Sequence, residues 1–144
     1  LYSDEPAGAF RAHVYPVRVY YEDTDAGGVV YHANYLRFAE RARTEMLRAA
    51  GIGQAALWAE QGLAFTVRRC EAEFIKPARL DDALEVHTRV IDARGARVEA
   101  EQVVKRAGDD IARLKLEIAC VDRQGKPARL PRTLSDAFAA SPNS

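Results

Sequence analysis

The clearest periodicity in the chain is a stripe of apolar positions three and four residues apart between residues 34 and 50. Its members are Tyr35, Phe38, Ala39, Ala42, Met46 and Ala49. A repeat near 3.6 residues predicts an amphipathic helix that buries one face. Asn34 is a typical N-cap residue and Gly51 typically follows a helix end, so we expect the helix to span 34–50. Weaker helical patterns cover 54–61 and 134–140.

Alternating apolar and polar positions predict strands on both sides of this helix. The expected strands are 14–21 before it and 63–74, 84–90, 98–104 and 114–120 after it. In the second of these, the apolar face changes parity between Val67 and Cys70. A period of two can change parity only at a bulge or a twist, which we place near Arg68 and Arg69.

This order, one strand, a long helix and four strands joined by short turns, predicts an α+β fold. Short turns between neighbouring strands require an antiparallel sheet, and the helix is long enough to lie across it. A chain of 144 residues is the size of one domain. We expect a core at about 14–131 and tails at 1–13 and 132–144. A small sheet on one helix leaves open edges, so an oligomer is expected.

Composition excludes several classes of function. Lys and Arg total 21 and so do Asp and Glu, so the chain lacks the positive excess of a nucleic-acid binder. No apolar run approaches the length of about 20 residues that crosses a bilayer, and the first residues lack the apolar core of an intact secretory signal. Cys70 and Cys120 are too few for a disulfide framework, and both lie in expected strands, which predicts buried free thiols and a cytoplasmic setting.

Common catalytic and cofactor motifs are missing from the sequence. The serines all lie near the ends, at positions 3, 135, 141 and 144, so no serine triad is expected. The three histidines do not have the spacing of metal ligands, and there is no phosphate-binding Walker loop. The glycines of GIGQAA, starting at Gly51, follow a helix and not a strand, so we interpret Gly51 as a helix stop. No metal or organic cofactor is expected.

The remaining candidate for chemistry is the segment YYEDTDAGGVVYHANY at 20–35, between the first strand and the long helix. It contains three carboxylates, Gly27-Gly28 and His32. The glycines allow a sharp turn, and the amides at a helix start can bind an anion or a polarised carbonyl oxygen. A carboxylate beside such donors can act as a base or a nucleophile. Two alternatives stay open: an acidic surface loop built on Asx turns, and, less favoured, a metal site.

The same segment carries a family resemblance. The chain resembles the hotdog-fold acyl-CoA thioesterases of the 4-hydroxybenzoyl-CoA thioesterase type, especially their Tol-Pal-associated branch. The similar segments are YEDTDAGGVVYH at 21–32, Asn34-Tyr35, ERAR at 40–43, IKPAR at 75–79 with Asp81-Asp82, and ARLP at 128–131. The resemblance implies a hotdog fold, a five-stranded antiparallel sheet wrapped around one long central helix.

It also implies residue roles. Asp25 corresponds to the essential carboxylate, which either attacks the thioester carbonyl or activates a water molecule. His32 stands where the family places a backbone amide against the thioester oxygen, and its imidazole either assists as acid, base or orienter or contributes nothing beyond that amide. Tyr31 is expected as a pocket wall, with Gly28 and Asn34 as further substrate-binding residues.

Glu40 is the second candidate carboxylate, because another hotdog branch has its catalytic acid on the central helix. Arg43 and Thr44 follow at the spacing of helical neighbours, so we favour a structural ion pair for Glu40. Dehydration of a hydroxyacyl thioester, a third hotdog chemistry, is disfavoured because the predicted helix carries no histidine.

The negative phosphates of coenzyme A require local positive charge. The candidates are Lys76 and Arg79, and the later run Arg123, Lys126, Arg129 and Arg132, among which Arg129 is selected. The alternative for each is a charged edge that deters strand pairing. The resemblance further implies a site between subunits, in homodimers that assemble into homotetramers.

The function expected is hydrolysis of an acyl-CoA thioester to a free acid and coenzyme A. A thioester of acyl carrier protein is an alternative substrate. The alternative function is a non-catalytic module that binds acyl thioesters, or a scaffold linked to lipid metabolism or the cell envelope. The acyl group is not readable from the sequence.

Overall fold

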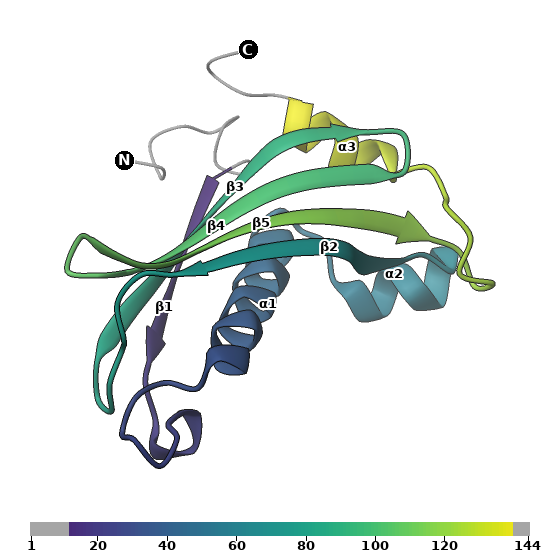
Figure 1. Cartoon of the computed structure of the whole chain (residues 1–144). Helices are drawn as coiled ribbons and strands as arrows, with labels where there is room; N and C mark the ends of the chain where they lie inside the picture. Colours follow the sequence, from purple (N-terminus) through teal and green to yellow (C-terminus); the bar gives the residue numbers. More distant parts are fainter. Residues whose placement is uncertain (1–11, 140–144) are drawn as a thin grey trace.

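The computed structural model describes residues 12–139. Its elements follow the predicted order (Figure 1). They are β1 (Ala12–Arg18), a short 3-10 turn (Tyr21–Asp23), α1 (His32–Ala49), α2 (Gln54–Gln61), β2 (Ala64–Phe74), β3 (Ala83–Arg94), β4 (Arg97–Arg106), β5 (Asp109–Val121) and α3 (Arg132–Ala139).

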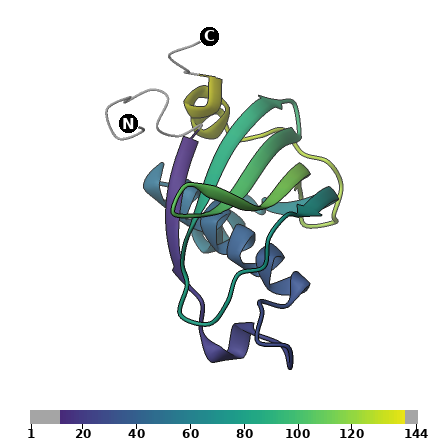
Figure 2. The same cartoon turned by 60° about the vertical axis from the view of Figure 1, so that its left-hand side comes forward.

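The five strands form one antiparallel sheet in the order β1-β3-β4-β5-β2. The sheet curls around α1, which packs against β1, β3 and β4 (Figures 1 and 2). β1 and β2 are therefore the two edges. The predicted α+β architecture, with one long helix against a curved antiparallel sheet, is confirmed.

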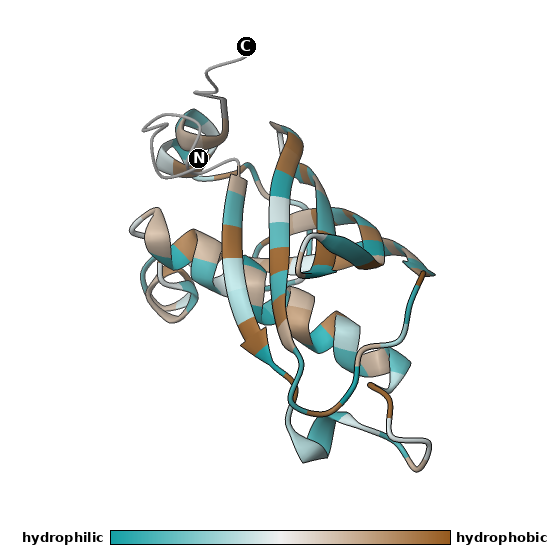
Figure 3. Ribbon diagram, turned by 90° about the vertical axis from the view of Figure 1, so that its left-hand side faces the viewer, coloured by the Kyte–Doolittle hydropathy of each residue, from teal (hydrophilic) through white to brown (hydrophobic). Residues whose placement is uncertain are grey.

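The core lies between α1 and the concave face of the sheet. Tyr35, Phe38, Ala39, Ala42 and Met46 of the predicted stripe are all buried there, whereas the last member, Ala49, is exposed. The strands contribute alternate residues, which appear as bands of hydrophilic and hydrophobic colour in Figure 3.

The predicted change of parity in β2 is also confirmed. The pairing of β2 with β5 shifts register between Val67 and Arg69, so Arg68 is the extra residue of a bulge. The bulge keeps Val67 and Cys70 opposite Ile118 and Leu116, which are buried. Without it, one half of β2 would turn its apolar side chains away from the helix.

Several boundaries differ from expectation. β1 ends at Arg18 and not at residue 21, because Tyr21–Asp23 form a 3-10 turn, and β3 and β4 are longer than predicted. α1 starts at His32 and not near Asn34, because Tyr31 is its N-cap and Asn34 lies inside the first turn. The long helix therefore does carry a histidine at its first position, contrary to the expectation.

β5 starts at Asp109, earlier than predicted, because charged residues at the hairpin hide the alternation. The core also extends past residue 131, since α3 buries Leu134 and Phe138 against it. Within residues 12–139, no helix is both long and apolar enough to span a membrane.

Candidate active site

The loop between β1 and α1 is organised around a buried carboxylate, Asp23, which is 4% exposed. One of its oxygens accepts a hydrogen bond from the Tyr20 amide at 2.8 Å, and the other accepts one from the Asn34 side-chain amide at 2.9 Å. Its carbonyl oxygen also accepts the Tyr31 amide at 3.0 Å. Asp23 therefore ties both ends of the loop to the start of α1.

Asp25 is exposed at the tip of the same loop. Its Oδ1 accepts hydrogen bonds from the amides of Gly27 at 2.8 Å and Val29 at 3.4 Å. A side chain at Gly27 would place its Cβ 3.3 Å from that oxygen, and Gly28 has a φ of +79°, in the left-handed region. The two glycines thus let the backbone fold closely around the carboxylate. Within residues 12–139, no hydrogen bond occupies Oδ2 of Asp25.

His32 is the first residue of α1. The N-cap residue, Tyr31, is extended and caps the helix with no side-chain hydrogen bond. The first amides of a helix have no partner within it, and they lie at the positive end of its dipole. The amides at the start of α1 can therefore bind a carbonyl oxygen or an anion.

A pocket of about 210 Å³ adjoins this helix start and includes His32, Tyr35, Phe74 and Lys76 in its lining. The His32 ring stacks on Phe74 with 4.5 Å between ring centroids, while Tyr31 lies further out and is 57% exposed. The Tyr35 hydroxyl accepts the amide of Ala78 at 3.1 Å, and burial raises the pKa of this hydroxyl.

Phe74 is a site residue that the sequence analysis did not select. It ends β2, where it is 42% exposed, and a large apolar side chain on an edge strand was the available signal. Its link to the site depends on contact with Tyr35 and His32, which are about forty residues away in sequence.

The structure brings most of the predicted site residues to one end of the molecule. Lys76 lines the pocket, and its ammonium lies 3.6 Å from the Asp109 carboxylate. Arg79 pairs with Val29 of the loop through an isolated backbone bridge. Asp25, Gly28, Tyr31 and His32 belong to the same loop or to the helix start.

Two predicted substrate contacts are not supported within one chain. Asn34 is 6% exposed, and its side-chain amide is bound to Asp23, so it serves the loop and not the pocket surface. Arg129 lies beside Gly95 and α3, at the end of the molecule opposite the Asp25 loop (Figure 1). The chain runs the full length of the β-sheet between these two places, and the number of residues between them does not reveal this distance in space.

The predicted Glu40–Arg43 ion pair is also wrong. No pair of ion-pair length joins these side chains in the described part of the chain. The Arg43 guanidinium instead donates to the side-chain oxygen of Gln102 on β4 at 3.0 Å. Glu40 is exposed, and it lines a second pocket further along α1.

A carboxylate held by loop amides, a few residues before a helix start without a side-chain cap, on a sheet wrapped around one helix, is an arrangement that suits thioester chemistry. The family model of the thioesterase-like superfamily matches residues 19–138, and the chain belongs to this family. The resemblance stated from the motifs is therefore confirmed.

Particular relatives are close. The chain is 47% identical over 125 residues to the acyl-CoA thioesterase YbgC of Haemophilus influenzae, covering 86% of this chain and 92% of that protein. It is 48% identical over 126 residues to the acyl-CoA thioester hydrolase YbgC of Escherichia coli O157:H7, covering 86% and 93%.

Solved structures share the fold. A probable thioesterase from Bartonella henselae superposes with a TM-score of 0.79 at 42% identity, covering 83% of this chain and 99% of that one. A 4-hydroxybenzoyl CoA thioesterase superposes with a TM-score of 0.83 at 19% identity, covering 89% and 99%. Because its sequence identity is low, the second structural match supports only the shared hotdog fold.

Proposed function

We propose that this enzyme hydrolyses acyl-CoA thioesters to a free carboxylic acid and coenzyme A, with Asp25 as the reacting carboxylate. The main support for the proposal is that one loop holds a fixed carboxylate and then leads into a helix start that has no side-chain cap. The Asp25 carboxylate is held by the amides of Gly27 and Val29, and α1 begins three residues after Val29. The names of the close relatives agree with this substrate class.

The first amides of α1 receive the thioester carbonyl oxygen in this mechanism. As the carbonyl carbon becomes tetrahedral, the oxygen gains negative charge that these amides stabilise. A donor of this kind typically lowers the barrier by about 2.7–4 kcal/mol. The loop around Asp23 keeps these donors in place before substrate binds, so little reorganisation is needed.

Asp25 acts by one of two routes. As a nucleophile, its Oδ2 bonds to the carbonyl carbon, the carbon–sulfur bond breaks and coenzyme A leaves as a thiolate that takes a proton. Water then hydrolyses the mixed anhydride and restores the carboxylate. As a general base, Oδ2 removes a proton from a water molecule that attacks the same carbon. Both routes release the same acid and thiol.

His32 and Tyr31 have supporting roles in the proposal. Stacking on Phe74 keeps the His32 imidazole at the pocket, where it can donate a proton to the leaving thiolate. Tyr31 forms an outer wall over which the pantetheine arm passes. Lys76 and Arg79 lie at the same end and bind coenzyme A phosphates.

A second subunit completes the site in this proposal. β2 is an open edge whose Val67 and Phe74 are each 42% exposed. Two copies related by a two-fold axis pair such edges antiparallel, so the far end of one copy lies beside the Asp25 end of the other. Arg129 of the second copy is then much closer to the site than Arg129 of the first. Pairing of these dimers gives a homotetramer. Both cysteines are free thiols, which supports a cytoplasmic setting, although only Cys120 is buried as expected and Cys70 is exposed on the β2 edge.

A thiol-release assay over a panel of acyl-CoA esters tests the function. Asp25→Asn keeps the fold and lowers the rate by roughly 10²–10⁴-fold, the usual contribution of a positioned catalytic group. Glu22→Gln is the matched control, because Glu22 is an exposed carboxylate of the same loop and has no assigned role. Release of thiol by Asp25→Asn at the wild-type rate, or by neither protein from any ester, would overturn the proposal; the second result favours a binding module.

A further inference from the structure

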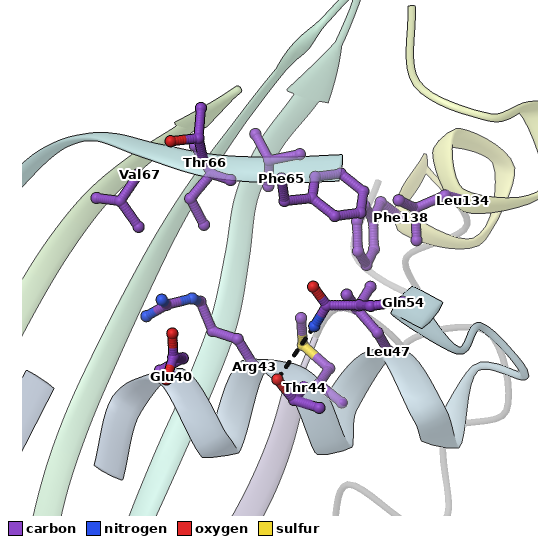
Figure 4. A pocket seen from close by; sticks show the side chains of 13 residues that line it. Glu40, Arg43, Thr44, Leu47, Gln54, Phe65, Thr66, Val67, Leu134 and Phe138 are labelled. Carbon is purple, nitrogen blue, oxygen red and sulfur yellow. Dashed lines mark hydrogen bonds between the residues drawn. The ribbon is translucent and has the colours of Figure 1, made fainter. Parts of the chain in front are cut away.

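The pocket of about 210 Å³ at the start of α1, here named the helix-start pocket, contains a polar group that the proposed mechanism does not use, the Tyr35 hydroxyl. The larger pocket, of about 330 Å³, lies further along α1, where the Gln54 side chain donates to the Thr44 hydroxyl at 3.1 Å (Figure 4). This larger pocket opens on the seam of the proposed dimer and therefore belongs to the site proposed above. The helix-start pocket contains the group without a role.

Tyr35 has a buried hydroxyl whose proton is not used. Its side chain is 2% exposed, and its oxygen accepts a hydrogen bond at 3.1 Å from the amide of Ala78, which is completely buried. A tyrosine hydroxyl both accepts and donates. Within residues 12–139, no acceptor receives the O–H of Tyr35. A buried donor without an acceptor is unfavourable, so a ligand that brings an acceptor into this pocket is favoured.

The hydroxyl is held in place by a segment that is itself fixed. The Ala78 carbonyl accepts the Val30 amide at 2.8 Å, and the neighbouring Pro77 carbonyl accepts a hydrogen bond from the Arg106 guanidinium at 3.1 Å. Burial is the largest effect on the pKa of Tyr35 and raises it, so the hydroxyl keeps its proton at neutral pH. Tyr35 therefore presents a donor of fixed position to the pocket.

The lining of the helix-start pocket includes groups that the proposed function assigns to both ends of coenzyme A. His32 is the first residue of α1, whose amides receive the thioester carbonyl, and Lys76 is proposed to bind phosphates. In coenzyme A the pantetheine arm joins the thioester sulfur to the phosphates, so the arm passes along this pocket. The arm is a neutral chain with two amide groups, and the carbonyl of each is a hydrogen-bond acceptor.

We propose that the Tyr35 hydroxyl donates a hydrogen bond to the pantetheine amide carbonyl nearer the thioester. Tyr35 is three residues after His32, about one helical turn further along α1. The nearer amide is separated from the sulfur by two methylene groups, so it is the amide within reach of this hydroxyl. Val29 and Ile75 in the lining are apolar and suit the methylene groups. This inference rests on the proposed function, because its ligand is an acyl-CoA.

Thioesters with and without this amide test the proposal. Butyryl-N-acetylcysteamine contains the amide, and S-butyl thiobutyrate has an alkyl chain in its place. The ratio of the two kcat/KM values, first ester over second, is compared between proteins, because any loss of folded protein cancels in it. Tyr35→Phe should lower the ratio roughly 3- to 12-fold, the usual effect of losing one neutral hydrogen bond. The change should lie mainly in KM, because the bond is present in the ground state.

Tyr21→Phe is the matched control, because Tyr21 is 82% exposed and is not part of the pocket lining; it should keep the wild-type ratio. A ratio that Tyr35→Phe leaves unchanged, or that Tyr21→Phe lowers equally, contradicts the assignment of Tyr35 while leaving the proposed function intact. Wild-type protein that hydrolyses neither of these esters nor butyryl-coenzyme A contradicts the proposed function, and the inference about its substrate is then wrong as well.

Discussion

At the scale of single residues, two aspartates separated by one threonine have opposite environments. Asp23 is buried and accepts a hydrogen bond on each carboxylate oxygen, whereas Asp25 is exposed and has one oxygen without a partner in the described residues. The first environment suits a structural group and the second suits a reacting group. The proposed division of roles would follow from burial and hydrogen bonding, since the two side chains are chemically identical.

Asp23→Asn is expected to destabilise the protein. An asparagine side chain has one acceptor oxygen, so its NH₂ group would face either the Tyr20 amide or the Asn34 amide, and both are donors. A buried donor without an acceptor costs about 1–3 kcal/mol. Urea unfolding followed by circular dichroism measures the change in free energy of unfolding.

The comparison variant is Asp25→Asn, whose side chain is exposed and should change the free energy of unfolding by less than about 0.5 kcal/mol. Equal stability of Asp23→Asn and wild type would show that the loop does not depend on this carboxylate.

At the scale of elements, the segment between β2 and β3 is attached to the loop that carries Asp25. The Val30 amide donates to the Ala78 carbonyl at 2.8 Å, and the Arg106 guanidinium donates to the Pro77 carbonyl at 3.1 Å. Arg106 also forms an ion pair with Asp82 at 2.7 Å. Lys76 and Arg79 therefore owe their position to a segment clamped by the end of β4.

The Arg106–Asp82 pair predicts a pH dependence of stability. Desolvation raises the pKa of Asp82, but the Arg79 amide and the Arg106 guanidinium outweigh it, so the pKa in the folded protein lies below its usual range. The pair therefore stabilises the fold above the unfolded pKa, about 3.9, and this contribution is lost as pH falls through the lower folded value.

Asp82→Asn should thus unfold at a lower urea concentration than wild type at pH 7. The difference between the two unfolding midpoints should become smaller toward pH 3. Urea titrations of both proteins between those pH values measure it. A gap that stays constant or widens toward acid would contradict an ionised, paired Asp82.

At the scale of the whole molecule, the main open feature is the β2 edge. α1 covers the β1 side of the sheet, and most of β2 is exposed in the single chain. An edge strand with unpaired backbone groups and apolar side chains favours pairing with another strand. The proposed dimer would cover this edge and join two incomplete sites.

Val67→Lys should shift the protein toward monomer, because Val67 lies where the pocket between α1 and β2 opens on the proposed seam, and a charge there costs desolvation in both copies. Analytical ultracentrifugation at several concentrations measures the distribution of species. Ile91→Lys is the control: it replaces an apolar residue of similar exposure, 39%, on β3, away from the β2 edge.

The control should keep at least the dimer. The proposal that β2 is the pairing edge would be wrong if the wild-type protein sediments as a monomer at micromolar concentration. It would also be wrong if Val67→Lys leaves the dimer unaffected.

Much of the architecture was predictable because it depends on neighbours in the sequence. Helical and strand periods and the parity change at Arg68 are local patterns, and they placed α1, the antiparallel strands and the bulge correctly. The motif from Tyr21 to His32 identified the family for a similar reason, because a loop followed by a helix start is a continuous segment.

Tertiary structure alone decided which side chains meet. Gln102 reaches Arg43 across 59 positions and displaces the expected partner, Glu40, because strand β4 passes beneath the helix. Arg129 is carried to the opposite end of the sheet from Asp25, and Phe74 is brought to His32. Local spacing cannot encode such contacts: they arise when distant segments pack, and burial then determines which polar groups must find one another.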